Sequence, residues 1–202
     1  MANVKTAVFV SGGGTNLQAL IDAKESGIIK DADFQLVLSS SEDAYALKRA
    51  ENAGIKTAVV SRKKSASQAD FEKGIIDELH KNDIELIVLA GFMSILSADF
   101  TKRYENRILN VHPALIPSFC GKGFYGLHVH EAALEYGVKV SGATVHFVNE
   151  IPDGGKIIMQ KAVDVLEGDT PEALQKRIME QAEWKILPLS VQKVASEIKN
   201  CK

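Results

Sequence analysis

The sequence predicts an α/β protein in which helices cover both faces of a mostly parallel sheet. Short apolar runs without polar alternation, such as residues 6–11 and 85–90, are typical of strands buried on both faces. Segments with helical periodicity lie between these runs, which is the order of right-handed βαβ units. Two of the helical segments end at a glycine, Gly27 and Gly54, as helices often do.

The first half of the chain is expected to alternate regularly between strand and helix. The expected strands are residues 6–11, 34–38, 57–60 and 85–90. The expected helices are residues 17–26, 44–53 and 68–81. In the last of these helices, Phe71, Ile75, Ile76 and Leu79 share one face. This order is Rossmann-like, so a ligand site is expected in the crevice at the carboxyl ends of the strands.

The second half of the chain is expected to complete the same sheet with an antiparallel part. A short helix is predicted at residues 99–104, then a strand ending near Asn110, a Pro- and Gly-rich loop at 113–126 and a helix at 129–136. Residues 140–148 and 156–163 have the pattern of a β pair joined by a turn at Asp153. The last helix should begin near Thr170 and run, with a break at Pro188, to Ile198. We therefore expect one domain over residues 1–202.

The composition is that of an ordinary globular protein. The chain has 202 residues, of which 46% are hydrophobic and 25% charged, with a net charge of -2. This balance does not favour nucleic acid or an anionic membrane as a partner. No signal peptide is recognisable at the start, and no apolar run approaches the ~20 residues that span a bilayer. Two cysteines, Cys120 and Cys201, provide no disulfide framework and suit the cytoplasm.

A glycine-rich segment follows the first expected strand and opens the first expected helix. Gly12, Gly13 and Gly14 would let backbone N–H groups approach an anion at the helix N-terminus. The segment is not a dinucleotide fingerprint, because Leu17 stands where the third glycine belongs, and no Walker A Lys follows. A single phosphate monoester is the better ligand. The alternative is a tight strand-to-helix turn with Thr15 as the N-cap residue.

Three polar residues suggest a catalytic site. Asn110 and His112 are two residues apart at the end of an apolar run, a spacing that puts both on one face of a strand. Asp153 follows the next strand pattern, in a turn rich in Pro and Gly. Each residue alone has an ordinary structural explanation. Together they could stabilise an oxyanion and move protons, which is the chemistry of acyl transfer to an amine.

Other candidate residues carry less weight. His128, His130 and His146 have a poor spacing for zinc and no cysteine pair beside them, so no metal site is expected. Cys120 is a possible nucleophile, but such a residue is more often a packed thiol, and nothing in the sequence suggests a depressed pKa.

Several segments together resemble one known family. They are residues 11–18 (SGGGTNLQ), 89–93 (LAGFM), 110–117 (NVHPALIP), 126–128 (GLH), 145–148 (VHFV) and 153–155 (DGG). In this order and spacing, the chain resembles the glycinamide ribonucleotide transformylases, which are folate-dependent formyltransferases, over essentially its whole length. The Asn-x-His-Pro and Asp-Gly-Gly motifs belong to the wider superfamily, whereas the glycine loop ending in Thr15-Asn16-Leu17 is the more specific mark.

The resemblance implies an activity and roles for the catalytic residues. The co-substrate 10-formyltetrahydrofolate would donate its formyl group directly to the amine of glycinamide ribonucleotide, a cytoplasmic step of purine biosynthesis. Asn110 and protonated His112 would stabilise the oxyanion of the tetrahedral intermediate. Asp153 would hold His112, raise its pKa and organise the water that carries protons. The substrates would be small molecules and the enzyme a monomer or homodimer.

The resemblance also implies binding residues in each half of the chain. Residues 1–100 would form the phosphate-binding half, where Gly14, Thr15 and Asn16 hold the substrate phosphate. Residues 101–202 would form the folate-site and catalytic half. Glu183 would lie near the ribose, although the segment between Arg177 and Glu183 is one residue longer here than in the family. The expected folate-binding residues are Met93, Ser94, Ile95, Leu96, Asn110, Asn149, Glu150 and Ile151.

The sequence departs from the family at a few positions, and other functions remain open. Ser94 and Gln68 stand where the family often has arginine, so Arg62, Lys63 or Lys64 would have to meet the folate glutamate tail. The loop at residues 118–125 is longer than in some members. A formyltetrahydrofolate hydrolase is the close alternative, and another formyltransferase of the superfamily, such as methionyl-tRNA formyltransferase, would need an RNA-binding extension. A non-catalytic nucleotide-binding module or a dehydrogenase is the alternative from a different class.

Overall fold

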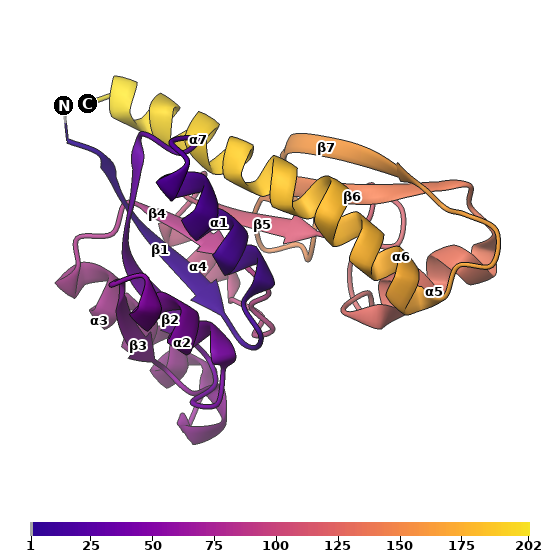
Figure 1. The fold of residues 1–202 in the computed structure, drawn as a ribbon. Coiled ribbons are helices and arrows are strands. Elements are labelled where there is room, and N and C mark those ends of the chain that lie inside the picture. Colours follow the sequence, from indigo (N-terminus) through magenta and orange to yellow (C-terminus); the bar gives the residue numbers. More distant parts are fainter. Residues whose placement is uncertain (1) are drawn as a thin grey trace.

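The computed structural model describes residues 2–202 and contains a seven-stranded sheet with the strand order β3-β2-β1-β4-β5-β6-β7 (Figure 1). The strands from β3 to β5 are parallel, and β6 and β7 are antiparallel to their neighbours. This confirms the predicted fold class, a mostly parallel α/β sheet with an antiparallel C-terminal part. Within residues 2–202 no helix has the length and apolar character required to cross a membrane.

The first half of the chain follows the expected alternation. Its elements are β1 (Val4–Val10), α1 (Thr15–Glu25), β2 (Ala32–Ser39), α2 (Tyr45–Asn52), β3 (Lys56–Val59), the 3-10 turn η1 (Arg62–Lys64), α3 (Gln68–Lys81) and β4 (Leu86–Leu89). Helix α3 occupies the predicted residues because Ser67 caps it, its hydroxyl accepting a hydrogen bond from the Asp70 N–H.

The second half contains α4 (Ala98–Arg103), β5 (Ile108–His112), α5 (Leu127–Tyr136), β6 (Val140–Phe147), β7 (Ile157–Asp164), α6 (Pro171–Ile178), the π turn η2 (Met179–Glu183) and α7 (Trp184–Asn200). Strand β5 does not end near Asn110 as expected but continues to His112. The reason is its pairing with β6, in which Asn110 lies opposite His146 and His112 lies opposite Thr144. The parallel pairing of β5 with β4 ends at Asn110, which is where the predicted strand ended.

Helices pack on both faces of the sheet and form two core clusters. On one face α1, α2, α6 and α7 cover strand residues such as Val8 and Val88, with Leu187 of α7 fully buried. On the other face α3 and α4 bury Phe71 and Phe100. The expected apolar face of α3 is confirmed, and each large side chain buried in this way stabilises the fold by about 1.5–3 kcal/mol.

The predicted break in the last helix is in the wrong place. Pro188 lies inside α7, and the helix continues through it to Asn200. The irregularity is the π turn Met179–Glu183, which precedes α7. A π turn closes its hydrogen bonds one residue further along than an α-helix does. It can therefore take up the one extra residue expected between Arg177 and Glu183.

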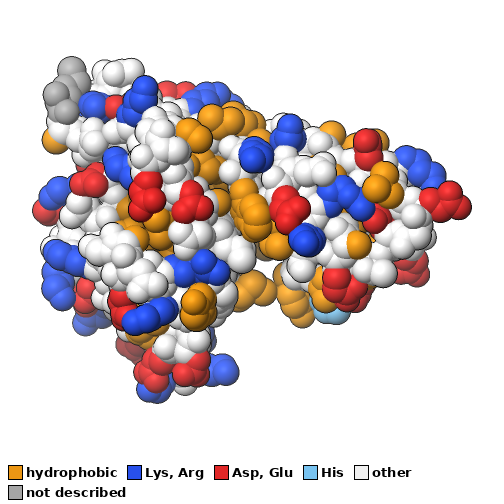
Figure 2. Space-filling model, viewed as in Figure 1, with side chains coloured by type: hydrophobic (Ala, Val, Ile, Leu, Met, Phe, Trp, Pro, Cys, Tyr) orange, Lys and Arg blue, Asp and Glu red, His pale blue; other side chains and the backbone are white. Residues whose placement is uncertain are grey.

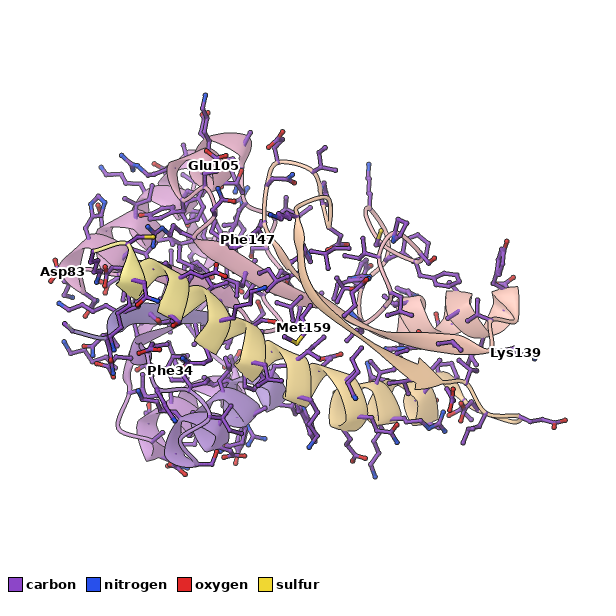
Figure 3. All side chains as sticks on the ribbon, turned by 90° about the horizontal axis from the view of Figure 1, so that it is seen from above. Phe34, Asp83, Glu105, Lys139, Phe147 and Met159 are labelled. Atoms are coloured by element: carbon purple, nitrogen blue, oxygen red, sulfur yellow. The ribbon has the colours of Figure 1, made fainter. Side chains whose placement is uncertain are left out.

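Beyond β4 the face of the sheet opposite α7 is covered by loops. Alternation along β5 turns Leu109 and Val111 toward the α7 side and Asn110 and His112 toward the other side. Figure 3 shows α7 on one side of β6 and β7 and the long loops on the other, with Phe147 at the end of β6. The loops that follow β5 and β6 thus meet over polar side chains.

Candidate active site

Asn110, His112 and Asp153 lie together on the loop-covered face of β5, as the sequence predicted, and His146 of β6 lies among them. The Nδ2 atom of Asn110 is 3.2 Å from Nε2 of His146. The Nδ1 atom of His112 is 3.5 Å from Oδ2 of Asp153, and Nε2 of His146 is 3.6 Å from Oδ1 of the same carboxylate. The four side chains form a continuous polar cluster.

His146 is the member of this cluster that was not predicted as a catalytic residue. Its Nδ1 atom lies 2.8 Å from the carbonyl oxygen of Phe147, and the side chain is buried. A neutral His146 accepts a hydrogen bond from Asn110, and a protonated one can donate to Asp153. What brings His146 to the cluster is the register of β6 against β5, which places His146 directly opposite Asn110. That register is not visible in the sequence.

The turn at residues 149–155 delivers Asp153 to the cluster. Strand β6 ends beside the start of β5, where the Val148 N–H donates to the Ile108 carbonyl, and the loop then folds back over the sheet. Asp153 has a positive φ of 57°. A side chain at Gly155 would collide with the Phe147 carbonyl, so only glycine permits the closure of this turn.

The Asp153 carboxylate is stabilised in its charged form. Burial pushes its pKa up, but hydrogen bonds from His146 and from the Gly121 N–H, which is 2.8 Å away, hold the pKa below its usual value. Asp153 is therefore an anion beside His112 at neutral pH. It also ties the loop after β5, which contains Gly121, to the loop after β6.

Both ring nitrogens of His112 face hydrogen-bond acceptors. Its Nε2 is 2.8 Å from the Phe119 carbonyl oxygen, and its Nδ1 faces Asp153. Burial lowers the pKa of His112, while the Asp153 charge and the Phe119 carbonyl oppose that shift without cancelling it. Asp153 thus raises the pKa of His112, as expected, but burial outweighs this effect. Only a protonated ring can donate to both acceptors.

The glycine loop lies at the carboxyl end of β1 and leads into α1. The alternative of Thr15 as the N-cap residue is wrong, because Gly14 holds that position with a φ of 72°. No side chain caps this helix end, so the N–H groups of its first turn are left for a ligand. Thr15 and Asn16 are the first two residues of the helix, which places both at this end.

Glu183 is brought to the same end of α1. The Nδ2 atom of Asn16 donates to Oε2 of Glu183 over 2.6 Å. Glu183 is buried at the end of the π turn, and burial raises its pKa, with the Asn16 hydrogen bond opposing the shift. The Oδ1 atom of Asn16 is buried without a partner among the described residues. A polar ligand at this point would find both a free acceptor and a carboxyl group.

Two loops flank Asn110 at the positions expected to bind folate. Residues 91–97 follow β4, and the Met93 N–H donates to the Ser11 hydroxyl over 2.9 Å. The Ile95 carbonyl accepts from Gln68, and Glu72 of α3 accepts from both the N–H and the hydroxyl of Ser97. Met93, Ser94 and Ile95 lie along this anchored loop; Met93 and Ile95 are exposed, whereas the Leu96 side chain belongs to the core under α3.

The second flanking loop contains Asn149, Glu150 and Ile151. The Asn149 side chain accepts a hydrogen bond from the Ile151 N–H over 3.0 Å, and the Ile151 side chain is exposed. Exposed apolar side chains on both flanking loops are suited to hold an aromatic ring system between them.

The remaining candidates fall outside the cluster. His128 is on the surface with Glu131, and His130 is buried with neither ring nitrogen hydrogen-bonded among the described residues. No three His, Cys, Asp or Glu side chains in residues 2–202 are grouped so as to hold a metal ion. Burial raises the pKa of the Cys120 thiol, and the Asp153 charge adds to this, which favours the packed thiol over the nucleophile.

A separate groove of about 570 Å³ runs between α1 and α7. Thr15, Arg49 and Trp184 line one part of it, and apolar side chains gather on this face of the molecule (Figure 2). None of the polar cluster residues lines the groove. The cluster, where an amide, an imidazole and a carboxylate converge, is therefore the candidate active site.

Comparisons with known proteins agree on one family. The profile of the formyl transferase family matches residues 4–191. The chain is 43% identical to the phosphoribosylglycinamide formyltransferase of Haemophilus influenzae over 93% of this chain and 85% of that protein. It is similar to the crystal structure of glycinamide ribonucleotide transformylase 1 from Symbiobacterium toebii, with a TM-score of 0.89, 39% identity and coverage of 96% of this chain and 89% of that one.

Longer proteins also contain a similar region. The chain is 46% identical, over 96% of its length, to part of the trifunctional purine biosynthetic protein adenosine-3 of Gallus gallus. It spans only 18% of the length of that relative, and 18% of the corresponding human protein.

Proposed function

Because the chain belongs to the formyl transferase family, we propose that it transfers the formyl group of 10-formyltetrahydrofolate to the amine of glycinamide ribonucleotide, in purine biosynthesis. The names of the relatives support this substrate. The observation that carries the proposal is the convergence of Asn110, His112 and Asp153 beside a glycine loop suited to a phosphate. Both substrates are small molecules, and the proposed compartment is the cytoplasm.

The reaction begins when the substrate amine attacks the formyl carbon. A new C–N bond forms, and the formyl oxygen becomes an oxyanion. Asn110 Nδ2 and His112 Nε2 donate hydrogen bonds to this oxygen, and one such donor typically contributes about 10²–10³ in rate. The intermediate then collapses, the bond from carbon to the folate N10 breaks, and the proton lost by the amine is delivered to N10 by a water held at Asp153.

The charge on the intermediate determines the protonation of His112. In the free protein burial keeps its pKa low, so the neutral ring is favoured at neutral pH. An anionic oxygen at Nε2 favours the protonated ring, and the Asp153 carboxylate at Nδ1 supports the same form. His112 is thus expected to be most strongly charged when the intermediate needs it. The Phe119 carbonyl, which faces Nε2 in the free protein, must give way to the substrate oxygen.

Both halves of the chain contribute to each proposed substrate site. Gly14, Thr15 and Asn16, in the half formed by residues 1–100, hold the phosphate at the start of α1, and Glu183 reaches the ribose from the π turn. In the half formed by residues 101–202, residues 149–151 bind the folate together with residues 93–96 and Asn110. Arg62 donates to Gln68 over 3.1 Å, and Gln68 donates to the Ile95 carbonyl of the folate loop, so Arg62 is the proposed partner of the folate glutamate tail.

A direct assay distinguishes the proposed transferase from its alternatives. Formation of the deformylated folate is followed by absorbance, with a 10-formylfolate donor in the presence and absence of glycinamide ribonucleotide. The proposal expects product only when the amine is present. Equal release in its absence identifies a hydrolase instead, and no release under either condition contradicts a formyl transfer function.

A further inference from the structure

Arg49 of α2 is held against the glycine loop by three contacts. Its Nε donates to the Gly13 carbonyl over 2.9 Å, and its Nη1 donates to Oε1 of Gln18 over 3.0 Å. Its guanidinium carbon lies 5.1 Å from the centre of the Tyr45 ring, within cation–π range. These contacts fix the side chain in one orientation, which is unusual for a partly exposed arginine. Its partners are all on α1, on the loop before α1 or on its own helix.

The loop is pinned to α2 at two successive carbonyl groups. The Ala46 N–H donates to the Gly12 carbonyl over 3.0 Å, and Arg49 takes the Gly13 carbonyl next to it. In a trans peptide the C=O and the following N–H point in opposite directions. Holding these two carbonyls toward α2 therefore turns the N–H groups of Gly13 and Gly14 away from α2. Neither N–H has a hydrogen-bond partner within residues 2–202.

The loop has no positive charge of its own. Residues 11–17 read SGGGTNL, without lysine or arginine. The positive charge that these contacts bring to the loop is the guanidinium of Arg49. It is bonded to the Gly13 carbonyl, which belongs to the same peptide group as the N–H of Gly14. A phosphate dianion at the start of α1 would be attracted by this charge as well as by the N–H groups.

We propose that Arg49 is a positioning residue for the substrate phosphate, acting through the Gly13 carbonyl to aim the loop N–H groups and adding its charge to the site. The inference rests on the proposed function for the identity of the phosphate, and nothing in the catalytic cluster depends on it. Arg49 acts on binding of the phosphorylated substrate and not on the chemistry at His112, which lies on β5.

The test compares two substrates in the Arg49→Gln variant, the ribonucleotide and the dephosphorylated glycinamide riboside. The KM for the ribonucleotide should rise roughly tenfold or more, the value of a hydrogen bond to a charged group. The kcat, the KM for the folate and the kcat/KM for the riboside should stay at the wild-type values. Lys48→Gln is the matched control, because Lys48 is the neighbouring cation of α2 and pairs only with Glu51 on the surface. Arg49→Lys keeps the charge but cannot make both hydrogen bonds, so its KM for the ribonucleotide should lie between those of the wild type and Arg49→Gln.

An equal loss for the ribonucleotide and the riboside would overturn the proposal, since a merely structural role would affect both. An unchanged KM for the ribonucleotide would overturn it too. If the wild-type protein formylates no ribonucleotide, the proposed function has failed. The role of Arg49 in phosphate binding is then tested separately, by the thermal shift that ribose 5-phosphate produces. The wild type should then be stabilised by this ligand and Arg49→Gln should not, and equal shifts in the two proteins reject the role of Arg49.

Discussion

Asn16 donates a hydrogen bond from Nδ2 to Oε2 of Glu183 over 2.6 Å, although the two residues are 167 positions apart in the sequence. The bond joins the first turn of α1 to the π turn before α7 and so closes one wall of the proposed ribonucleotide site. Glu183 has Asn16 as the one side-chain partner that opposes the effect of its burial.

We expect Glu183→Gln to stabilise the protein near neutral pH and to weaken ribonucleotide binding. Burial raises the pKa of Glu183, so the wild type loses stability as pH rises from about 4.5 through that raised pKa. Glutamine removes this loss, and the unpartnered Oδ1 of Asn16 can accept from its amide. The Tm should rise by roughly 2–4 °C for each kcal/mol gained, and the difference should shrink as pH falls toward about 4.5. The KM for the ribonucleotide should increase.

Glu180→Gln on the exposed side of the same turn is the control for Glu183. It removes a carboxylate that has only the surface pair with Lys176, so its Tm should match the wild type. A lower Tm for Glu183→Gln at about pH 8 would show that the buried carboxylate is not a cost to folding.

His112→Ala should abolish most turnover while leaving phosphate binding intact. Loss of an oxyanion donor and proton carrier costs about 10²–10⁴ in kcat. The His112 side chain is bonded to Phe119 and Asp153 and to no residue of the glycine loop within residues 2–202, so the thermal shift with ribose 5-phosphate should be unchanged. His128→Ala, which removes a surface imidazole paired with Glu131, should keep full activity. Activity near the wild-type level in His112→Ala would exclude the proposed role.

His146→Gln tests whether His146 positions Asn110 and Asp153. We expect kcat to fall by roughly tenfold with little change in either KM, because His146 holds an oxyanion donor and does not touch the substrate phosphate. His146→Ala should fall further, since glutamine can still accept from Asn110 and alanine cannot. If both variants lose the same activity, the hydrogen bond to Asn110 has no part in the reaction.

Gly14→Ala should destabilise the protein even without substrate. A Cβ at Gly14 would lie 2.6 Å from the Cβ of Ala46, and the φ of 72° is unfavourable for alanine. We expect a loss of about 1–3 kcal/mol in urea unfolding. Gly12→Ala is the matched control, because its Cβ would meet no atom within 4 Å. Equal stability of the two variants would show that the loop can move away from α2.

His130→Leu should make the protein less sensitive to acid. Burial, with a smaller contribution from the charge of His112, lowers the pKa of His130 from 6.5 to about 4. A group with a depressed pKa in the folded state stabilises the wild type above pH 6.5 and loses this contribution as pH falls toward about 4. With leucine at this buried site, the Tm should depend less on pH between 6.5 and about 4. His80→Leu on the surface should follow the wild-type profile, and a wild-type profile for His130→Leu would contradict the burial argument.

Local sequence patterns determine most of the fold. Strands such as β1 and β4 are buried on both faces and therefore read as apolar runs, and Ser67 marks the start of α3. The length of β5 and the position of the break before α7 were not predictable in this way. The first depends on pairing with β6, and the second on a π turn, whose residues have no distinctive local signal.

The site was predictable where spacing alone fixes geometry. Asn110 and His112 share a face because they are two apart in a strand, and Asp153 was marked by its turn. His146 and Arg49 were not found as site residues, because their partners lie on elements remote in sequence: His146 meets Asn110 across a strand pair, and Arg49 meets Gly13 from another helix. The net pKa of His112 depends on the depth of its burial, which a sequence does not contain.

If the folate binds as proposed, the hydrogen bond from His112 Nε2 to the Phe119 carbonyl makes it compete with the protein's own chain for this imidazole. The apparent dissociation constant of the donor therefore exceeds its intrinsic value by the inverse of the fraction of molecules in which the carbonyl has withdrawn. The same contact occupies His112 Nε2 in the protein without ligand. On the proposed mechanism, substitutions in the loop at 113–126 that weaken this hydrogen bond would raise the affinity for the donor without any change in the residues that contact substrate.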